Sequence, residues 1–271
     1  MSVEKFGRAA CIALFLGSLA FGRAGAAAEN RPLEGNTLLA VFAHPDDEQT
    51  VAPMLARYAR QGARVVIVIA TDGRYGVTEF SGLGEGEETV QARAKEMECA
   101  ATALGVELVH LDYHDQLKAG EGYDGHIPHV RSLLKDVATL VQRFEPDAIV
   151  TWGPDGGSNH MDHRLIGATV TGVYLSKEWE KPASLYFYGT PASQIENDDS
   201  KLLRGVADRY MNVALAFEEQ DLELAKQALR CHRSQYTDND VKRIMDGKEE
   251  HGRVIYLRKF EVPGNATPTL F

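Results

Sequence analysis

Apolar runs rich in β-branched residues alternate with amphipathic, helix-patterned segments along most of this chain. The run ARVVIVIATDG, residues 63–73, is hydrophobic at consecutive positions, which is typical of a parallel strand buried on both faces. We expect strands over 36–43, 63–73, 106–112, 147–157 and 183–189, and helices over 48–62, 87–106, 127–146 and 161–179. This alternation predicts an α/β fold, built as an open, mostly parallel sheet with helices on both faces.

The C-terminal part of the chain is less regular. It contains a helical pattern over 218–232, between strand-like stretches at 208–216 and 253–262. No internal repeat and no low-complexity linker interrupts the sequence. A length of 271 residues suits one sizeable domain, and we expect residues 29–271 to form it.

The N-terminus has the order of a secretory signal peptide. Lys5 and Arg8 precede an apolar run over 9–21, and a stretch of small residues over 24–28 follows that run. This order predicts a cleaved signal peptide over 1–28 and export to the periplasm or the exterior. The apolar run is shorter than the roughly 20 residues that a spanning helix needs, which disfavours a membrane anchor.

The charge of the chain disfavours some classes of binding partner, and its cysteines leave one possible disulfide undecided. A formal net charge of −10 disfavours nucleic acid and anionic membranes, because both bind basic faces. Cys99 and Cys231 remain after the signal peptide, both in helix-patterned segments. An exported protein could pair them, although a small buried apolar residue is the commoner role of a helical cysteine. The sequence decides neither this pairing nor the oligomeric state.

Polar clusters follow four of the expected strands. HPDDE, residues 44–48, comes directly after the first strand, and TDG, residues 71–73, ends the second. Residues 112–115 and the loop 153–163 follow the third and fourth. Ligands of open parallel sheets bind outside the carboxyl ends of the strands. Because all of these clusters fall on that edge, they predict an active site there.

Two of the clusters carry the residue types of a metal site. HPDDE and NHMDH, residues 159–163, supply histidines and carboxylates, and a catalytic metal takes two or three imidazoles and a carboxylate. A further carboxylate beside the ligands could take a proton from an activated water. Single histidines more often bond locally, but two clusters at adjacent strand ends favour a metal. Spacing does not decide which aspartate is the ligand, and the residues fit iron as well as zinc.

The same motifs resemble those of the PIG-L/LmbE-like family of zinc-dependent N-acetylglucosaminyl deacetylases. The resemblance consists of AHPDDE at 43–48, TDG at 71–73, RAKE at 93–96 before LGV at 104–106, and HMDH at 160–163. The stretch ALRCHRSQY, residues 228–236, is similar to the family's downstream His-x-Ser-Gln. The resemblance covers about residues 36–236 and implies a Rossmann-like fold and removal of acetyl groups from N-acetylglucosaminyl compounds.

Carried over position by position, the resemblance implies a role for each polar residue of the two main motifs. The metal ligands would be His44, Asp47 and His163, with Zn2+ expected and Fe2+ as the alternative. Asp46 would be the general base, and His160 would stabilise the oxyanion or help to protonate the leaving amine. Asp162 would orient a histidine.

The chain departs from the family pattern at one position. Part of the family has a tyrosine two residues before the first histidine of HMDH, thought to help in acid catalysis, and this chain has Ser158 there. Either His160 supplies the proton alone or another group does, and Tyr123 and Tyr236 are candidates.

Other residues on the same edge are candidate substrate contacts, namely Asp72, Arg93 and Asp115. Arg93 could equally form a surface ion pair, and Asp115 could equally stabilise a turn. Trp152 could stack on a sugar, but core packing is more common for tryptophan.

These observations favour a metal-dependent hydrolase that removes an acetyl group from an N-acetylated amino sugar, either a small molecule or a glycan. An amidase of the same fold that cleaves a larger amide is the first alternative. A glycan-binding module without activity is the second, and Asp46 argues against it, because binding alone needs no base beside a metal ligand.

Overall fold

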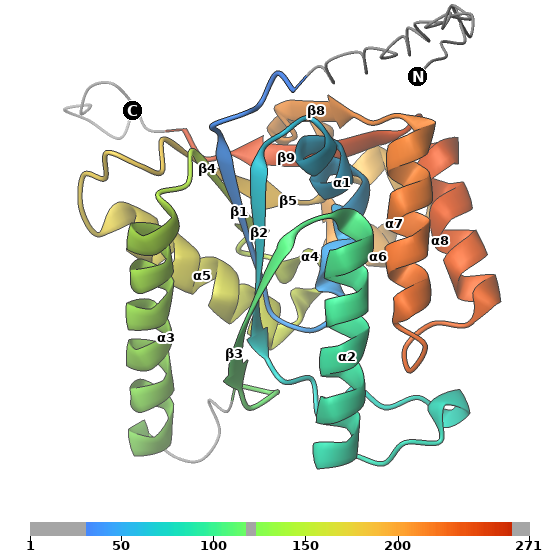
Figure 1. Cartoon of the computed structure of the whole chain (residues 1–271), viewed down its shortest axis with the longest axis horizontal. Coiled ribbons are helices and arrows are strands. Elements are labelled where there is room, and N and C mark those ends of the chain that lie inside the picture. The colour runs from blue at the N-terminus through green and yellow to red at the C-terminus, as the bar shows by residue number, and fades with distance from the viewer. Residues whose placement is uncertain (1–30, 118–122, 262–271) are drawn as a thin grey trace, which may run out of the picture. The chain divides into compact units, whose positions relative to one another are not determined.

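The computed structural model describes residues 31–117 and 123–261, with the backbone alone over 123–130. Its centre is a seven-stranded sheet in the order β3-β2-β1-β4-β5-β9-β8 (Figure 1). The parallel strands are β1 (Thr37–Phe42), β2 (Arg64–Thr71), β3 (Glu107–Tyr113), β4 (Ala148–Trp152) and β5 (Ser184–Tyr188). β9 (Val254–Lys259) pairs antiparallel with β5 and with β8 (Val213–Ala216). The predicted open, mostly parallel α/β sheet is confirmed.

Helices cover both faces of this sheet, as predicted (Figure 1). One face packs against α1 (Ala52–Arg60), α2 (Glu87–Leu104), α7 (Glu219–Cys231) and α8 (Asp238–Glu250). The other packs against α3 (Tyr123–Phe144) and α5 (Met161–Leu175). β1 contributes side chains to the hydrophobic cores on both faces of the sheet. Leu38 and Phe42 lie in the core under α1, α2, α7 and α8, and Leu39 and Val41 lie in the core under α3 and α5. Burial on both sides explains its uninterrupted run of hydrophobic residues.

The order of the strands places a crevice beside β1. Along the chain the sheet grows from β1 through β2 to β3, and then resumes on the other side of β1 with β4 and β5. The loops that leave β1 and β4 therefore diverge, which is where open α/β sheets bind their ligands. HPDDE follows β1 and the loop 153–163 follows β4, so the two histidine-containing motifs lie on either side of this crevice.

Several elements were not predicted from the sequence. They are the short helices α4 (Gly156–Asn159) and α6 (Asp198–Arg204), the helix α8, and a two-stranded sheet of β6 (Thr190–Pro191) and β7 (Gly205–Val206). α8 buries only Val241 and Met245 well and is otherwise mostly polar, so few hydrophobic positions mark it in the sequence. The segment from β6 to β7 lies between β5 and β8 in the chain.

Cys99 and Cys231 form a disulfide. The sequence left this pairing open, and the structure decides it in favour of the bridge. α2 and α7 lie side by side (Figure 1) and bring the two Cα atoms to 5.7 Å, within the range that a disulfide spans. Because the two cysteines are 132 positions apart in sequence, their proximity depends on tertiary packing.

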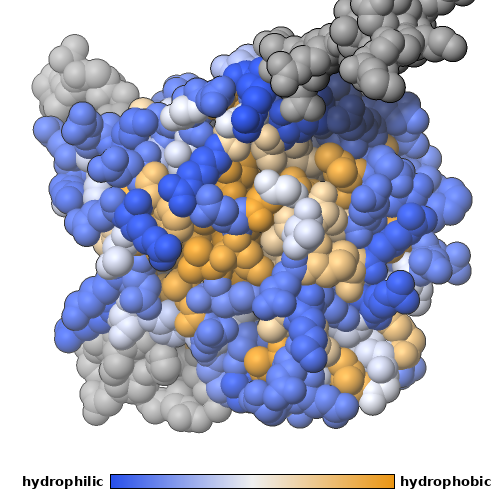
Figure 2. Space-filling model, in the orientation of Figure 1, coloured by the Kyte–Doolittle hydropathy of each residue, from blue (hydrophilic) through white to orange (hydrophobic). Residues whose placement is uncertain are grey.

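Hydrophobic side chains also appear on the surface. Figure 2 shows them toward the centre of one face, surrounded by hydrophilic side chains. Among the described residues, no helix combines the length and the apolar character that a bilayer crossing requires. The expected signal peptide, residues 1–28, lies outside the described residues and stays a prediction.

Candidate active site

The chain turns sharply after β1 and presents HPDDE to the crevice. Asp46 has a φ of 117°, a backbone conformation that residues with a side chain rarely adopt. Asp47 holds the turn, because its Oδ2 accepts hydrogen bonds from the backbone N–H groups of Ala43 and His44, both at 2.9 Å. The turn thus places His44, Asp46 and Asp47 together at the strand end.

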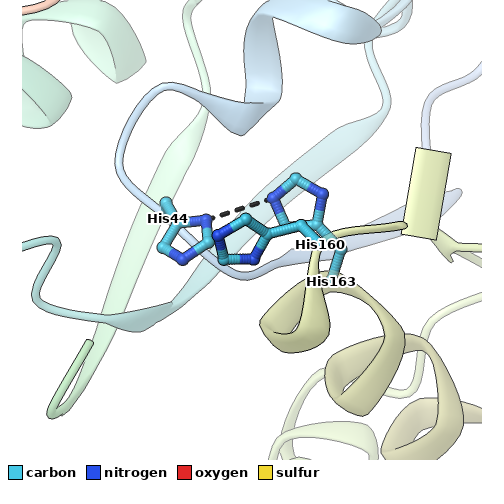
Figure 3. Close-up of side chains that lie close together, drawn as sticks. All are labelled: His44, His160 and His163. Atoms are coloured by element: carbon cyan, nitrogen blue, oxygen red, sulfur yellow. Dashed lines mark hydrogen bonds between the residues drawn. The ribbon is translucent and has the colours of Figure 1, made fainter. Parts of the chain in front are cut away.

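His44 and His163 face each other across the crevice (Figure 3). His44 Nδ1 lies 3.1 Å from His163 Nε2, and Asp47 Oδ1 lies 3.2 Å from the same His163 nitrogen. Asp47 Oδ2 lies 3.7 Å from His44 Nδ1. The residues predicted as metal ligands are therefore brought together, two from the turn after β1 and one from the first turn of α5.

Hydrogen bonds behind each ring indicate where its proton lies. His163 Nδ1 lies 2.9 Å from the carbonyl oxygen of Gly156 and donates to it, so Nε2 keeps its lone pair. His44 Nε2 lies 3.1 Å from Asp162 Oδ2 and 3.2 Å from Asp115 Oδ1, which favours a proton on Nε2 and a lone pair on Nδ1. Two imidazole lone pairs and a carboxylate oxygen then converge, and this is a donor set that fits a divalent metal.

The electrostatics of the cluster favour a cation. Burial lowers the pKa of His44, but the carboxylates of Asp115, Asp162 and Asp47 outweigh burial and raise that pKa well above its ordinary value. Burial likewise raises the pKa of Asp47, but His163 and His44 outweigh burial and hold it well below its ordinary value. Carboxylates thus surround the converging nitrogens. His160 and His163 also lie close enough to His44 for the three to share one ion, as do Asp115 and Asp162 on the far side of the His44 ring.

Trp152, at the end of β4, holds two of the predicted ligands in place. Its ring stacks on His163, with centroids 4.1 Å apart and planes 3° apart, and its Nε1 donates to Asp47 Oδ2 at 3.2 Å. The residue is buried, as expected for a core tryptophan. Its contact with the metal ligands was not predicted from the sequence, although its position at a strand end on the active edge was a usable signal.

Asp46 lies beside the cluster with both carboxylate oxygens engaged. Arg93 Nη2 lies 3.1 Å from Oδ1, and the Tyr236 hydroxyl donates to Oδ2 at 3.3 Å. Burial raises the pKa of Asp46, and Arg93 opposes that rise without cancelling it. Asp46 lines a cavity of about 680 Å³ together with Asp47, His163 and Tyr236. We refer to this cavity as the metal cleft.

His160 is at the N-terminus of α5 and close to His44 (Figure 3). Its ring centroid lies 4.7 Å from that of His44 and 4.8 Å from that of His163. Its Nδ1 accepts a hydrogen bond from the backbone N–H of Asp162 at 3.3 Å, so the proton of the neutral ring is on Nε2. Burial lowers the pKa of His160, and the neighbouring His44 and His163 lower it further.

The residues expected to touch substrate make their observed contacts within the protein. Arg93 is buried and donates to the carbonyl oxygens of Gly73 and Pro45, so it is not a surface ion pair. Asp72 accepts hydrogen bonds from Arg74 and from the backbone N–H of Asp115. Asp115 in turn contacts His44 and accepts a hydrogen bond from the Tyr75 N–H. These are the contacts of positioning residues, and a direct substrate contact stays a prediction.

Of the two tyrosines considered as proton donors in place of Ser158, the structure describes the side chain of Tyr236 only. Tyr236 lines the metal cleft and reaches Asp46, and burial raises its pKa, so the phenol stays protonated. The Tyr123 side chain lies outside the described residues. Ser158 lines the metal cleft.

Other contacts join the HPDDE turn to the segment after α7. Glu48 accepts a hydrogen bond from His232 at 2.7 Å, and both side chains are fully buried. Ser234 donates to Glu96 through its N–H and through its hydroxyl, both at 2.7 Å. Glu96 belongs to the RAKE motif, and His232 and Ser234 belong to HRSQ. The sequence identified these motifs but did not predict the partners of their residues.

The chain is similar in sequence to known deacetylases. The family model described as PIG-L, GlcNAc-PI de-N-acetylase, matches residues 39–174. A 1D-myo-inositol 2-acetamido-2-deoxy-alpha-D-glucopyranoside deacetylase 2 from Catenulispora acidiphila is 29% identical over 275 residues, covering 83% of this chain and 90% of that protein. A deacetylase of the same name without the final numeral, from Mycobacterium sp., is 29% identical over 197 residues, covering 66% of this chain and 62% of that protein.

Solved structures share the fold. The N,N'-diacetylchitobiose deacetylase of Pyrococcus horikoshii superposes with a TM-score of 0.60 at 22% identity, covering 83% of this chain and 84% of that chain. The zinc-inhibited form of a teicoplanin deacetylase gives 0.61 at 18% identity, covering 83% and 99%. A 4-carboxy-2-hydroxymuconate hydratase from Pseudomonas putida gives 0.62 at 16% identity, covering 86% and 100%. Since a hydratase has the same fold, the fold does not by itself specify deacetylation.

The family match includes most of β1, the HPDDE turn, β4 and the HMDH segment, so it contains every residue predicted as a metal ligand. It also spans half of the chain. On this evidence the protein belongs to the PIG-L family, the family of GlcNAc-PI de-N-acetylase.

Proposed function

We propose that this protein is a metal-dependent hydrolase that removes the acetyl group from an N-acetylated amino sugar. The observation that carries the proposal is the convergence of His44 Nδ1, His163 Nε2 and the Asp47 carboxylate, with Asp46 beside Asp47 and His163 in the metal cleft. The names of the two curated relatives, both deacetylases of a 2-acetamido sugar linked to inositol, support the substrate class.

His44, Asp47 and His163 would hold the metal, and His160 lies close enough to the two histidines to be a further donor. A bound divalent ion would polarise the acetamide carbonyl and make water easier to deprotonate. Two imidazoles and one carboxylate suit zinc, which is our proposal, and they also suit ferrous iron.

Asp46 is positioned to move the proton. It would accept a proton from the attacking water and deliver it to the nitrogen as the C–N bond breaks, so that acetate and a free amine result. Each oxygen of Asp46 has one donor, Arg93 or Tyr236, and a carboxylate oxygen has two lone pairs. One acceptor site therefore stays free on each oxygen, and burial gives Asp46 a higher affinity for a proton than an exposed aspartate has.

His160 supplies a hydrogen-bond donor for the substrate carbonyl oxygen. Its Nδ1 is occupied by the Asp162 N–H, which leaves the Nε2–H free to bond the oxygen that becomes negative when the carbonyl is attacked. Because its pKa is lowered, His160 is neutral near pH 7 and does not repel a bound cation.

The direct test is acetate release by the purified, metal-loaded protein from N-acetylglucosamine and its conjugates, before and after chelation. We expect about one metal ion per chain, acetate release that chelation abolishes, and recovery when zinc is returned. Release of a larger acid without acetate would indicate the alternative amidase. Metal and sugar binding without any release would indicate a binding module, and either result would overturn the proposal.

We also propose export, from the order of residues in the N-terminal segment. A disulfide between Cys99 and Cys231 is compatible with an oxidising compartment. N-terminal sequencing of protein recovered from cell fractions tests this, since the mature chain should begin near residue 29 and be found outside the cytoplasm. An intact N-terminus in the cytoplasmic fraction would contradict it.

A further inference from the structure

A second cavity adjoins the metal cleft. It has a volume of about 240 Å³, and Thr50, Tyr188, Thr190 and Gln194 line both cavities. Thr50 ends the short 3-10 helix η1 (Asp47–Thr50), and its hydroxyl donates to the carbonyl oxygen of Asp47 at 2.8 Å. The second cavity therefore lies within one helical turn of a predicted metal ligand.

The charged lining of this second cavity is entirely basic. Arg243, Lys248 and His251 contribute to it, and no aspartate or glutamate is among its lining residues. Arg243 and His251 are exposed, whereas Lys248 is half-buried. We refer to this cavity as the Lys248 pocket.

Lys248 has no carboxylate partner in the part of the chain that the structure describes. Its Nζ donates one hydrogen bond, to the carbonyl oxygen of Thr50 at 3.1 Å, so two of the three ammonium N–H groups remain. Three acids of the same helix pair with other residues, in the pairs Asp240–Arg243, Asp246–Lys242 and Glu249–Arg253.

An ammonium group in this position lacks a counter-charge. Burial lowers the pKa of Lys248 to about 8, and no acid offsets that loss. A buried cation without a partner is destabilising, and a bound anion would remove the penalty. A purely structural lysine that caps the Thr50 carbonyl is the alternative explanation, but it accounts for neither the cavity nor the other basic residues.

We propose that the Lys248 pocket binds an anionic group, a phosphate, sulfate or carboxylate, carried by the substrate whose N-acetyl group lies in the metal cleft. The inference rests on the proposed function and deepens it, since it assigns the substrate to the acidic amino-sugar conjugates. The shared lining residues, Tyr188 and Gln194 among them, place the two cavities next to each other, so one substrate would reach both. Arg243, which is paired with Asp240, and His251 also line this pocket and offer further N–H donors.

The test compares neutral and anionic substrates. Acetate release is measured from N-acetylglucosamine and from its 1-phosphate and 6-phosphate, and the readout is the ratio of kcat/KM for the better phosphate to that for the neutral sugar. We expect a ratio of about 10 or more in the wild type. Lys248→Met should lower this ratio about tenfold through KM, and Lys248→Arg should preserve most of it. Lys242→Met, which removes an exposed lysine of the same helix outside the pocket, is the matched control and should leave the ratio unchanged.

Binding of inorganic phosphate, followed by 31P NMR on the metal-loaded protein, gives a readout that needs no turnover. Phosphate should bind at least tenfold more weakly to Lys248→Met than to Lys242→Met. Phosphate that binds at Lys248 while phosphorylated sugars gain no advantage would point to a free anion and overturn the substrate assignment. An unchanged ratio and unchanged phosphate binding in Lys248→Met would overturn the pocket itself. Absence of acetate release from every sugar, with Lys248-dependent phosphate binding retained, would instead refute the proposed function.

Discussion

Glu48 and His232 are 184 residues apart in sequence and form a 2.7 Å hydrogen bond within the core. Glu48 belongs to the HPDDE turn, and His232 follows the last residue of α7, just before the segment that supplies Tyr236. The pair thus fixes the two chain segments that meet at Asp46, and His232 and Glu48 both act electrostatically on that carboxyl.

The stability that this pair contributes should depend on pH. Burial lowers the pKa of His232, but Glu48 outweighs burial and raises it. The folded state therefore binds the proton more tightly than the unfolded state does. This contribution is full below the unfolded pKa of about 6.5 and is lost as the pH rises through the folded value, by about 1.4 kcal/mol for each unit of pKa difference. The free energy of unfolding is measured by urea titration for the wild type and for the double variant Glu48→Gln/His232→Gln. The wild type should be the more stable of the two by a larger margin at pH 6 than at pH 9. An equal difference at both pH values would contradict the ion pair.

Reduction of the disulfide should destabilise the protein. Cys99 and Cys231 close a long loop and tie α2, which carries Arg93 and Glu96, to the end of α7. A bridge of this kind contributes about 2–5 kcal/mol to the free energy of unfolding. Urea unfolding with and without a phosphine reductant should show this loss. The Cys99→Ser/Cys231→Ser variant should be insensitive to reductant, and a wild type that is equally insensitive would argue against the bridge.

Loss of the indole N–H of Trp152 should weaken metal binding. Trp152→Phe keeps a ring against His163 but removes the donor to Asp47. Partners behind metal ligands typically change affinity 10–100-fold, and we expect a loss in this range by competition with a chelator. Trp179→Phe is the control, because the Trp179 Nε1 donates to the Val173 carbonyl, outside the site. Equal affinities of the two variants would show that Trp152 only fills the core.

Arg93 should influence the pH at which kcat/KM falls on the acidic side of its pH profile. Arg93 lowers the pKa of Asp46 against the effect of burial, so removal of its charge should raise that pKa further. In Arg93→Met the acidic limb of kcat/KM should move to higher pH, because the base is protonated over a wider range. Arg93→Lys keeps the charge and should shift the limb less. If the acidic limb does not move in Arg93→Met, the group whose protonation abolishes activity is not Asp46.

The sequence predicted the sheet and the edge that carries the site, because both follow from periodicity and from the position of polar residues after strands. HPDDE and HMDH could be assigned to neighbouring loops for that reason. The family resemblance, not the spacing, identified Asp47 as the ligand and Asp46 as the base. These assignments remain predictions, although the observed geometry suits them.

The parts that could not be predicted depend on packing between distant segments. The stacking of Trp152 on His163 and the pairing of Cys99 with Cys231 require the relative placement of helices and strands, which local patterns do not contain. Lys248 lies in a helix rich in charged residues, where a lysine is normally solvated. Only the fold shows that its ammonium points to the Thr50 carbonyl.

The central claim is that Asp46 is the base beside a metal held by its neighbours, and Asp46→Asn tests it most directly. Metal content and acetate release are measured together on the same preparation, with Asp112→Asn as an exposed control on the same sheet edge. We predict that Asp46→Asn keeps about one metal ion per chain and loses a factor of about 10²–10⁴ in kcat, while Asp112→Asn retains both. Full activity in Asp46→Asn, with the metal in place, would contradict the account.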